Sequence, residues 1–194
     1  MKRINRVCVY CGSSGRVAEI YRSAATRTGM LLARAGIEVI YGGGRIGLMG
    51  LVADAALSAG GRVTGIIPGF LHDRELGHTG ISELIVAESM HERKQRMFEL
   101  ADAFVILPGG LGTLDEAFEC ITWRQLGLHD RPIVLVDIGG YWQPLMRLID
   151  RVVETGFAPR ATHDFFKLVL TPEEMLAAIS AAPEPTMPHT ADRV

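Results

Sequence analysis

Residues 103–116 read AFVILPGGLGTLDE, an apolar run that passes through a glycine-rich turn into the start of a helix. The run Ala103–Leu107 shows no polar alternation, which is typical of a strand buried on both faces of a parallel sheet. The turn Pro108–Thr113 holds three glycines, and a helical pattern follows from Leu114 to Leu126. We therefore expect a strand, a turn that lets a ligand approach the backbone, and a helix.

The same alternation of apolar runs and amphipathic stretches covers most of the 194 residues. Six further strands are expected, the last of them at a sheet edge: Arg6–Tyr10, Ile37–Tyr41, Arg62–Ile67, Glu83–Ala87, Pro132–Val136 and Phe165–Leu170. The other helical patterns are Ala18–Ala35, Leu48–Ala59, Met90–Ala101, Trp142–Glu154 and a last helix that opens with Thr171 and Pro172. This order predicts one α/β domain over residues 1–181, a Rossmann-like doubly wound parallel sheet with helices on both faces. The prolines and polar residues of 182–194 predict a flexible tail.

Composition and charge exclude several classes of protein. The net charge of −2 gives no electrostatic footprint for nucleic acid or an anionic membrane. No apolar run has the length of a membrane span, and residues 1–6 are too short and polar for a signal peptide. Cys8, Cys11 and Cys120 form no disulfide framework, and the CxxC is expected to be small buried residues. We expect a cytoplasmic protein with neither a nucleic-acid nor a membrane partner.

Three glycine-rich loops follow predicted strands: Gly12–Gly15, Gly42–Gly50 and Pro108–Thr113. In an open parallel sheet, ligands bind beyond the carboxyl ends of the strands, near the point where the strand order reverses. Glycines there let backbone N–H groups approach an anion. The three loops predict a phosphate-bearing ligand, and the first two contribute the candidate contacts Gly12, Ser13, Gly43 and Gly44.

Cofactor-dependent enzymes fit the pattern less well. Gly42–Gly47 matches GxGxxG, but it follows the second strand, and the next strand ends at Ile66-Ile67-Pro68 without the expected acid. No GxxxxGK[ST] is present, so a triphosphate enzyme is not indicated. Among Lys2, Lys94 and Lys167, only Lys94 is arguable as a Schiff-base residue, and its arginine neighbours favour an anion clamp. With no His/Cys/Asp cluster at ligand spacing, we expect no metal site and no cofactor.

Two short segments carry side chains that could take part in catalysis or in binding an anion. Glu116 follows the third glycine loop, where a carboxylate would activate water or hold a ribose hydroxyl, but Thr113-x-x-Glu116 also reads as a capping box. Arg93 and Lys94 fall in the first turns of a helix capped by Ser89, where the helix dipole disfavours cations. Either an anion lies nearby, or both side chains reach into solvent.

The motifs PGGLGTLDE (residues 108–116) and MHERK (residues 90–94) together resemble the Lonely Guy family of cytokinin riboside 5′-monophosphate phosphoribohydrolases. VCVYCGSS at residues 7–14 and YGGG at 41–44 are similar to further family segments, and the likeness covers roughly residues 6–180. Asp115 stands where glutamate is common in the family. The family is often labelled lysine decarboxylase, a label that the scarcity of lysines argues against.

The resemblance implies hydrolysis of the N-glycosidic bond of N6-substituted adenosine 5′-monophosphates, such as cytokinin riboside 5′-monophosphates, and of AMP. The products would be free base and ribose 5-phosphate. It implies Arg93 and Glu116 as the catalytic pair, and a homodimer or larger homo-oligomer with the active site near the subunit interface. The implied substrate contacts are Glu75, Arg93, Lys94, Gly110, Leu111, Gly112, Thr113, Leu114, Asp115, Glu116 and Thr122. A nucleotide-binding carrier or sensor of the same fold, which leaves the nucleotide intact, is the alternative.

Overall fold

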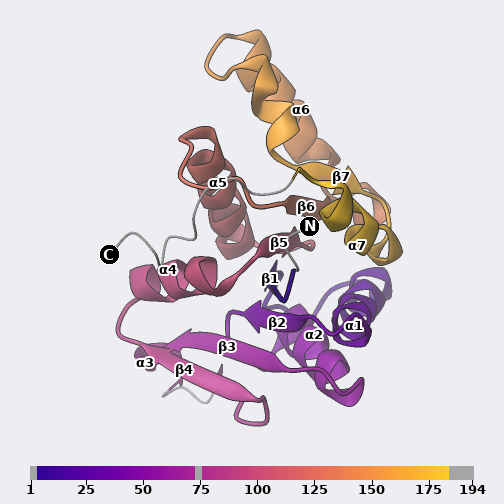
Figure 1. The fold of residues 1–194 in the computed structure, drawn as a ribbon, viewed down its shortest axis with the longest axis vertical. Helices are drawn as coiled ribbons and strands as arrows, with labels where there is room; N and C mark the ends of the chain where they lie inside the picture. Colours follow the sequence, from indigo (N-terminus) through magenta and orange to yellow (C-terminus); the bar gives the residue numbers. More distant parts are fainter. Residues whose placement is uncertain (1–3, 73–75, 184–194) are drawn as a thin grey trace.

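The computed structural model describes residues 4–72 and 76–183. They form one seven-stranded sheet of strand order β4-β3-β2-β1-β5-β6-β7, in which each neighbouring pair is parallel (Figure 1). The strands are β1 (Arg6–Tyr10), β2 (Glu38–Tyr41), β3 (Val63–Pro68), β4 (Glu83–Ala87), β5 (Ala103–Ile106), β6 (Ile133–Val136) and β7 (Lys167–Val169). The predicted doubly wound parallel sheet is confirmed, with β7 at its edge as expected.

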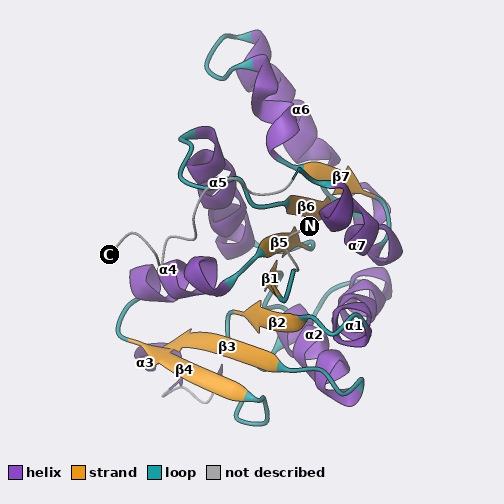
Figure 2. Cartoon of the chain, viewed as in Figure 1, coloured by secondary structure: helices purple, strands orange, loops and turns teal. Residues whose placement is uncertain are grey.

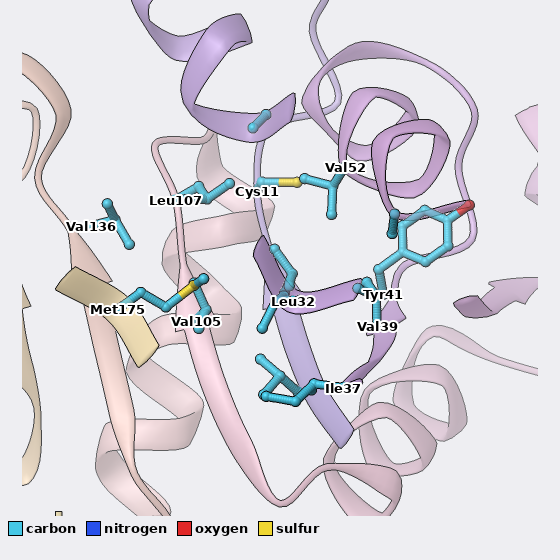
Figure 3. Close-up of a cluster of buried hydrophobic side chains, with 14 of the residues drawn as sticks. Cys11, Leu32, Ile37, Val39, Tyr41, Val52, Val105, Leu107, Val136 and Met175 are labelled. Carbon is cyan, nitrogen blue, oxygen red and sulfur yellow. The ribbon is translucent and has the colours of Figure 1, made fainter. Parts of the chain in front are cut away.

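Helices cover both faces of the sheet (Figure 2). Alternate β1 side chains point to opposite faces, so Val7 packs into one core cluster with Leu32, while Cys8 packs into a second with Phe98. Figure 3 shows part of the first cluster, around Leu32 and Val52. The helices over that face are α1 (Glu19–Arg34), α2 (Gly47–Ser58) and α7 (Pro172–Ala181). Those over the other face are α4 (Met90–Leu100), α5 (Leu111–Gln125) and α6 (Gln143–Glu154).

Most element boundaries agree with the sequence prediction to within one or two residues, but α5 does not. It begins at Leu111 instead of Leu114, with Gly110 as its N-cap residue. The amide of Leu114 already donates to the carbonyl of Gly110 at 3.0 Å, so the turn from Gly110 to Thr113 is helical. The N–H groups of a first turn make no intrahelical bonds, so glycine is tolerated there despite its poor helix propensity.

The reversal of strand order falls between β1 and β5, and it brings two of the glycine loops together. The amide of Gly12 donates to the carbonyl of Pro108 at 3.1 Å. A Cβ atom on Gly12 would lie 3.3 Å from Gly109 Cα, so backbone packs on backbone at this point. The loop after β2 adjoins them, because Leu48 donates its amide to the carbonyl of Gly12 at 3.0 Å. The three glycine loops therefore meet at the switch point.

Three short elements have no periodic signal in the sequence: α3 (Gly69–Leu71), η2 (Ile138–Gly140) and η3 (Arg160–Phe165). All three cysteines are buried and free, as expected for small core residues. Within residues 4–72 and 76–183, no helix combines the length and apolar character needed to cross a bilayer. The predicted contact Glu75 lies outside the described residues, as does the predicted tail from residue 184 onward.

Candidate active site at the switch point

A cavity of about 250 Å³ opens at the carboxyl ends of β1, β2 and β5. Seven of the predicted site residues line it: Ser13, Arg93, Gly110, Leu111, Gly112, Thr113 and Glu116. A larger hollow, of about 330 Å³, lies at the amino ends of β6 and β7. None of the predicted site residues lines that hollow, and ligands of open α/β sheets bind at the opposite edge. The switch-point cavity is therefore the candidate site.

Arg93 reaches the cavity from the first turns of α4. That helix begins at Met90 because the hydroxyl of Ser89 accepts the amide of Glu92 at 3.1 Å, as the sequence predicted. The Arg93 guanidinium donates from Nε to the carbonyl of Ile66 at 3.2 Å and from Nη2 to that of Gly42 at 3.4 Å. The ends of β2 and β3 thus fix the guanidinium.

Gly42 leaves the space that this arrangement requires. A Cβ atom at position 42 would lie 1.9 Å from Nη2 of Arg93. No side chain larger than hydrogen fits at this position while the guanidinium keeps its place. The second glycine loop therefore contributes to the site by admitting Arg93.

Glu116 faces Arg93 across the cavity. Its Oε1 lies 3.4 Å from Nη1 of Arg93, and the two side chains are only 9% and 12% exposed. Burial raises the pKa of Glu116 to about 7, although the Arg93 guanidinium acts in the opposite direction. A carboxyl that exchanges its proton near neutral pH is suited to general acid–base catalysis.

The capping-box interpretation of Glu116 is wrong. Since α5 begins at Leu111, Thr113 lies inside the helix and does not cap it. The Glu116 side chain instead points into the cavity toward Arg93. Capping of the helix therefore does not explain the presence of a glutamate at position 116.

The N-terminus of α5 (Gly110–Thr113) forms the open side of the cavity. Leu111 is 85% exposed, and a Cβ atom on Gly110 or Gly112 would meet nothing within 4 Å. The amides of a first helical turn lack intrahelical acceptors and carry the positive end of the helix dipole. This geometry suits a phosphate group.

Lys94 turns away from the cavity. Its Nζ lies 3.1 Å from a carboxylate oxygen of Asp115 and 3.1 Å from one of Glu119. Burial lowers the pKa of Lys94, but the hydrogen bonds to Glu119 and Asp115 outweigh it and leave the pKa above its ordinary value. Such a lysine is a poor nucleophile for Schiff-base chemistry. The anions that the sequence indicated beside Arg93 and Lys94 are thus carboxylates of α5.

The remaining predicted contacts do not line the cavity. Thr122 is exposed farther along α5, and Leu114 is half-buried on the same helix. Gly12, Gly43 and Gly44 are buried within the loops that support the cavity, with Gly43 in the left-handed region at φ +73°. These three glycines shape the loops that support the cavity.

Two residues that line the cavity, Met49 and Leu71, escaped sequence reasoning. Together with Met97 they give the cavity an apolar wall. Trp123 does not line the cavity and packs edge-on against Phe98, with ring centroids 4.5 Å apart. The hydroxyl of Tyr141 donates to the carbonyl of Gly109, immediately before the N-terminus of α5. The only sequence signal for Tyr141 is its place after β6, the strand next to β5.

The chain resembles known proteins in sequence. Residues 49–179 match the model of a family described as possible lysine decarboxylase. The chain is 44% identical over 174 residues to the probable cytokinin riboside 5′-monophosphate phosphoribohydrolase LOGL2 of Oryza sativa subsp. japonica, covering 90% of this chain and 71% of the relative. It is 43% identical over 179 residues to the phosphoribohydrolase LOG5 of Arabidopsis thaliana, covering 92% and 78%.

Solved structures show the same fold at lower identity. The molybdenum cofactor binding protein of Rippkaea orientalis superposes with a TM-score of 0.72 at 19% identity, covering 93% of this chain and 98% of that one. The Moco carrier protein of Chlamydomonas reinhardtii gives a TM-score of 0.69 at 20% identity, covering 92% and 96%. At these identities the likeness concerns the fold alone.

A doubly wound parallel sheet with a buried ion pair beside a helix N-terminus at the switch point is typical of α/β proteins that bind phosphorylated small molecules. The identity to the relatives is high and spans most of both chains. The chain belongs to the family of cytokinin riboside 5′-monophosphate phosphoribohydrolases.

Proposed function

We propose that this protein hydrolyses the N-glycosidic bond of N6-substituted adenosine 5′-monophosphates, such as cytokinin riboside 5′-monophosphates, and of AMP. The products are the free base and ribose 5-phosphate. The observation that carries the proposal is the buried Arg93–Glu116 pair beside the N-terminus of α5. Relatives at more than 40% identity bear the name of this activity.

The substrate's phosphate belongs at the N-terminus of α5. Amides of Gly110–Thr113 donate to its oxygens, and the helix dipole favours its charge. Binding there fixes the ribose relative to Glu116 and turns binding energy into orientation of the reacting bond. The apolar wall formed by Met49, Leu71 and Met97 offers a surface to the base.

Glu116 supplies the acid–base chemistry. As the C1′–N9 bond breaks, its electron pair passes to the base, and positive charge develops on the ribose. The ionised carboxylate stabilises that charge and removes a proton from the water whose oxygen bonds to C1′. Arg93 orients the carboxylate and favours its ionised form, in opposition to burial. The departing base takes up one proton, so the reaction is balanced as a hydrolysis.

The proposed activity is tested by incubating the protein with AMP and with isopentenyladenosine 5′-monophosphate and following free base by chromatography. Release from both nucleotides, faster from the prenylated one, is expected. Stoichiometric binding with the nucleotide recovered intact would contradict hydrolysis and favour a carrier or sensor.

We further propose a homodimer formed through the outward side of α5. Leu111, Phe118 and Leu126 are 85%, 41% and 65% exposed, and their spacing places them on one side of the helix. Thr122 lies on the same side. It lies six positions after Glu116, about 9 Å along the helix and about 240° around it. Thr122 therefore cannot reach a ligand beside Glu116 of its own subunit. In a dimer formed through α5, it would reach the ligand bound by the second subunit.

The cytosol is the compartment we propose. Support comes from the three buried thiols, which are free, since such residues persist where disulfides do not form. The small negative net charge supports the absence of nucleic-acid and membrane partners.

A further inference from the structure

One hydroxyl from outside the predicted motifs contacts the glycine loop of the candidate site. Tyr141 follows β6 and donates its hydroxyl hydrogen to the carbonyl oxygen of Gly109. This carbonyl belongs to the peptide group that joins Gly109 to Gly110, the N-cap residue of α5. The contact thus ties the start of α5 to a separate turn of the chain.

The turn that carries Tyr141 is tightly held. The buried carboxylate of Asp137 accepts the amide of Trp142 at 2.6 Å and the side-chain amide of Gln143 at 2.6 Å. Gly140 has φ +76°, a conformation that favours glycine and lets the chain reverse. Tyr141 therefore projects from a fixed point of the backbone.

The ring of Tyr141 is also fixed. It packs edge-on against Trp142, with centroids 4.9 Å apart, and edge-on against Tyr21 of α1 at 5.9 Å. Two aromatic neighbours restrict the ring's orientation, and so direct its hydroxyl at one acceptor. A donor held in this way can constrain the group that accepts from it.

The peptide group between Gly109 and Gly110 needs such a constraint. With glycine on both sides, no Cβ atom of either residue opposes its rotation. In a planar trans peptide the carbonyl and the following N–H point in opposite directions. Fixing the Gly109 carbonyl on Tyr141 therefore fixes the direction of the Gly110 amide, which belongs to a residue of the cavity wall.

We infer that Tyr141 is a positioning residue that aims the Gly110 amide at the substrate's 5′-phosphate. The inference rests on the proposed function, because it requires a phosphate at the N-terminus of α5. Without the hydroxyl, rotation of this peptide turns a carbonyl oxygen toward the phosphate and exchanges attraction for repulsion. Loss of the hydroxyl therefore weakens the binding of the phosphate group and leaves the binding of the base unchanged.

The test compares Tyr141→Phe with Tyr21→Phe. Tyr141→Phe keeps the ring and removes only the hydroxyl, while Tyr21→Phe removes a hydroxyl from the neighbouring ring. Calorimetric titration of each protein with ribose 5-phosphate and with adenine separates phosphate binding from base binding. Tyr141→Phe should weaken the binding of ribose 5-phosphate by about tenfold, which corresponds to the loss of one charge-assisted hydrogen bond. Its affinity for adenine and its melting temperature should stay unchanged. Tyr21→Phe should change neither affinity.

Steady-state kinetics with AMP give a second readout. The KM of Tyr141→Phe should rise by about the same factor, with kcat within about twofold of the wild type. The inference would be overturned if Tyr141→Phe bound ribose 5-phosphate as tightly as the wild type does. It would also be overturned if Tyr141→Phe lost as much affinity for adenine as for ribose 5-phosphate. If the wild type did not bind ribose 5-phosphate, the phosphate site at α5 and the inference would both be ruled out. Base release from AMP by the wild type reports on the proposed function separately.

Discussion

Glu116 combines burial with an ion-pair partner, two influences that act on its carboxyl in opposite directions. Burial disfavours the charged form, Arg93 favours it, and burial is the stronger, because the pKa rises to about 7. The side chain therefore samples both protonation states near neutral pH. An acid–base role needs that property, and a purely structural ion pair does not.

Replacing Glu116 with glutamine should remove catalysis and spare binding. The amide of the Glu116→Gln variant keeps the size of the side chain but accepts no proton, so kcat for AMP should fall by at least about a hundredfold. The dissociation constant for AMP, measured by calorimetry, should stay within a few-fold. Glu119→Gln, on the same helix but paired with Lys94, is the control and should remain active. Undiminished turnover in Glu116→Gln would refute its catalytic role.

The raised pKa of Glu116 also predicts a pH-dependent stability. Between about pH 4.5 and 7 the folded protein holds a proton that the unfolded chain has released, so this contribution to stability falls as pH rises. The shift corresponds to about 3 kcal/mol. Urea unfolding at pH 4.5 and pH 8 should show the wild type losing stability relative to Glu116→Gln by an amount of that order. A difference that stays constant with pH would contradict the raised pKa.

The loop after β2 and helix α4 act as a unit, because the space at Gly42 admits Arg93. Gly42→Ala would place a methyl group on the guanidinium. The end of a flexible side chain can move, so the protein should fold with little change in melting temperature. The displaced Arg93 no longer orients Glu116, and kcat/KM for AMP should fall by about tenfold or more.

Gly15→Ala is the matched control for that substitution. It lies in another glycine loop with nothing within 4 Å of the added methyl group, so activity should be preserved. Equal activities of the two variants would show that the fit between Gly42 and Arg93 has no functional consequence.

At the level of elements, sequence reasoning succeeded where burial leaves a long signal. Apolar runs such as Ala103–Leu107 identify strands covered on both faces. The start of α5 was missed, because Gly110 offers no side-chain cap and Gly110 and Gly112 are poor helix formers. Tyr141 had no sequence signal beyond its place after β6, since its role depends on a contact with a distant loop.

For the whole molecule, the sequence predicted the sheet but not which strands are neighbours. The adjacency of β1 and β5 joins segments almost a hundred residues apart, and local patterns carry no information about such pairing. The same limit applies to the site. Arg93 and Glu116 belong to different helices, and their identification as a pair came from family resemblance instead of spacing. Their contact at 3.4 Å supports the pairing, and their roles remain predictions.

The proposed homodimer gives a prediction at this largest scale. Phe118→Glu or Leu126→Glu places a charge on the outward side of α5 and should convert the dimer to monomers, measured by light scattering after size-exclusion chromatography. Leu170→Glu, at another exposed leucine after β7, should leave the mass unchanged. Dimers in all three variants would exclude α5 as the interface.

In the glycine loops that support the cavity, Gly12 packs against Gly109 through main chain alone. The shape of this glycine contact therefore does not depend on which side chains surround it. The apolar wall, in contrast, consists of three flexible or branched side chains, Met49, Leu71 and Met97. Under the proposed function, reaction chemistry and choice of base therefore belong to separate parts of the cavity. Descendants of this protein, natural or engineered, can alter the apolar wall to accept a different base while inheriting the glycine contact intact.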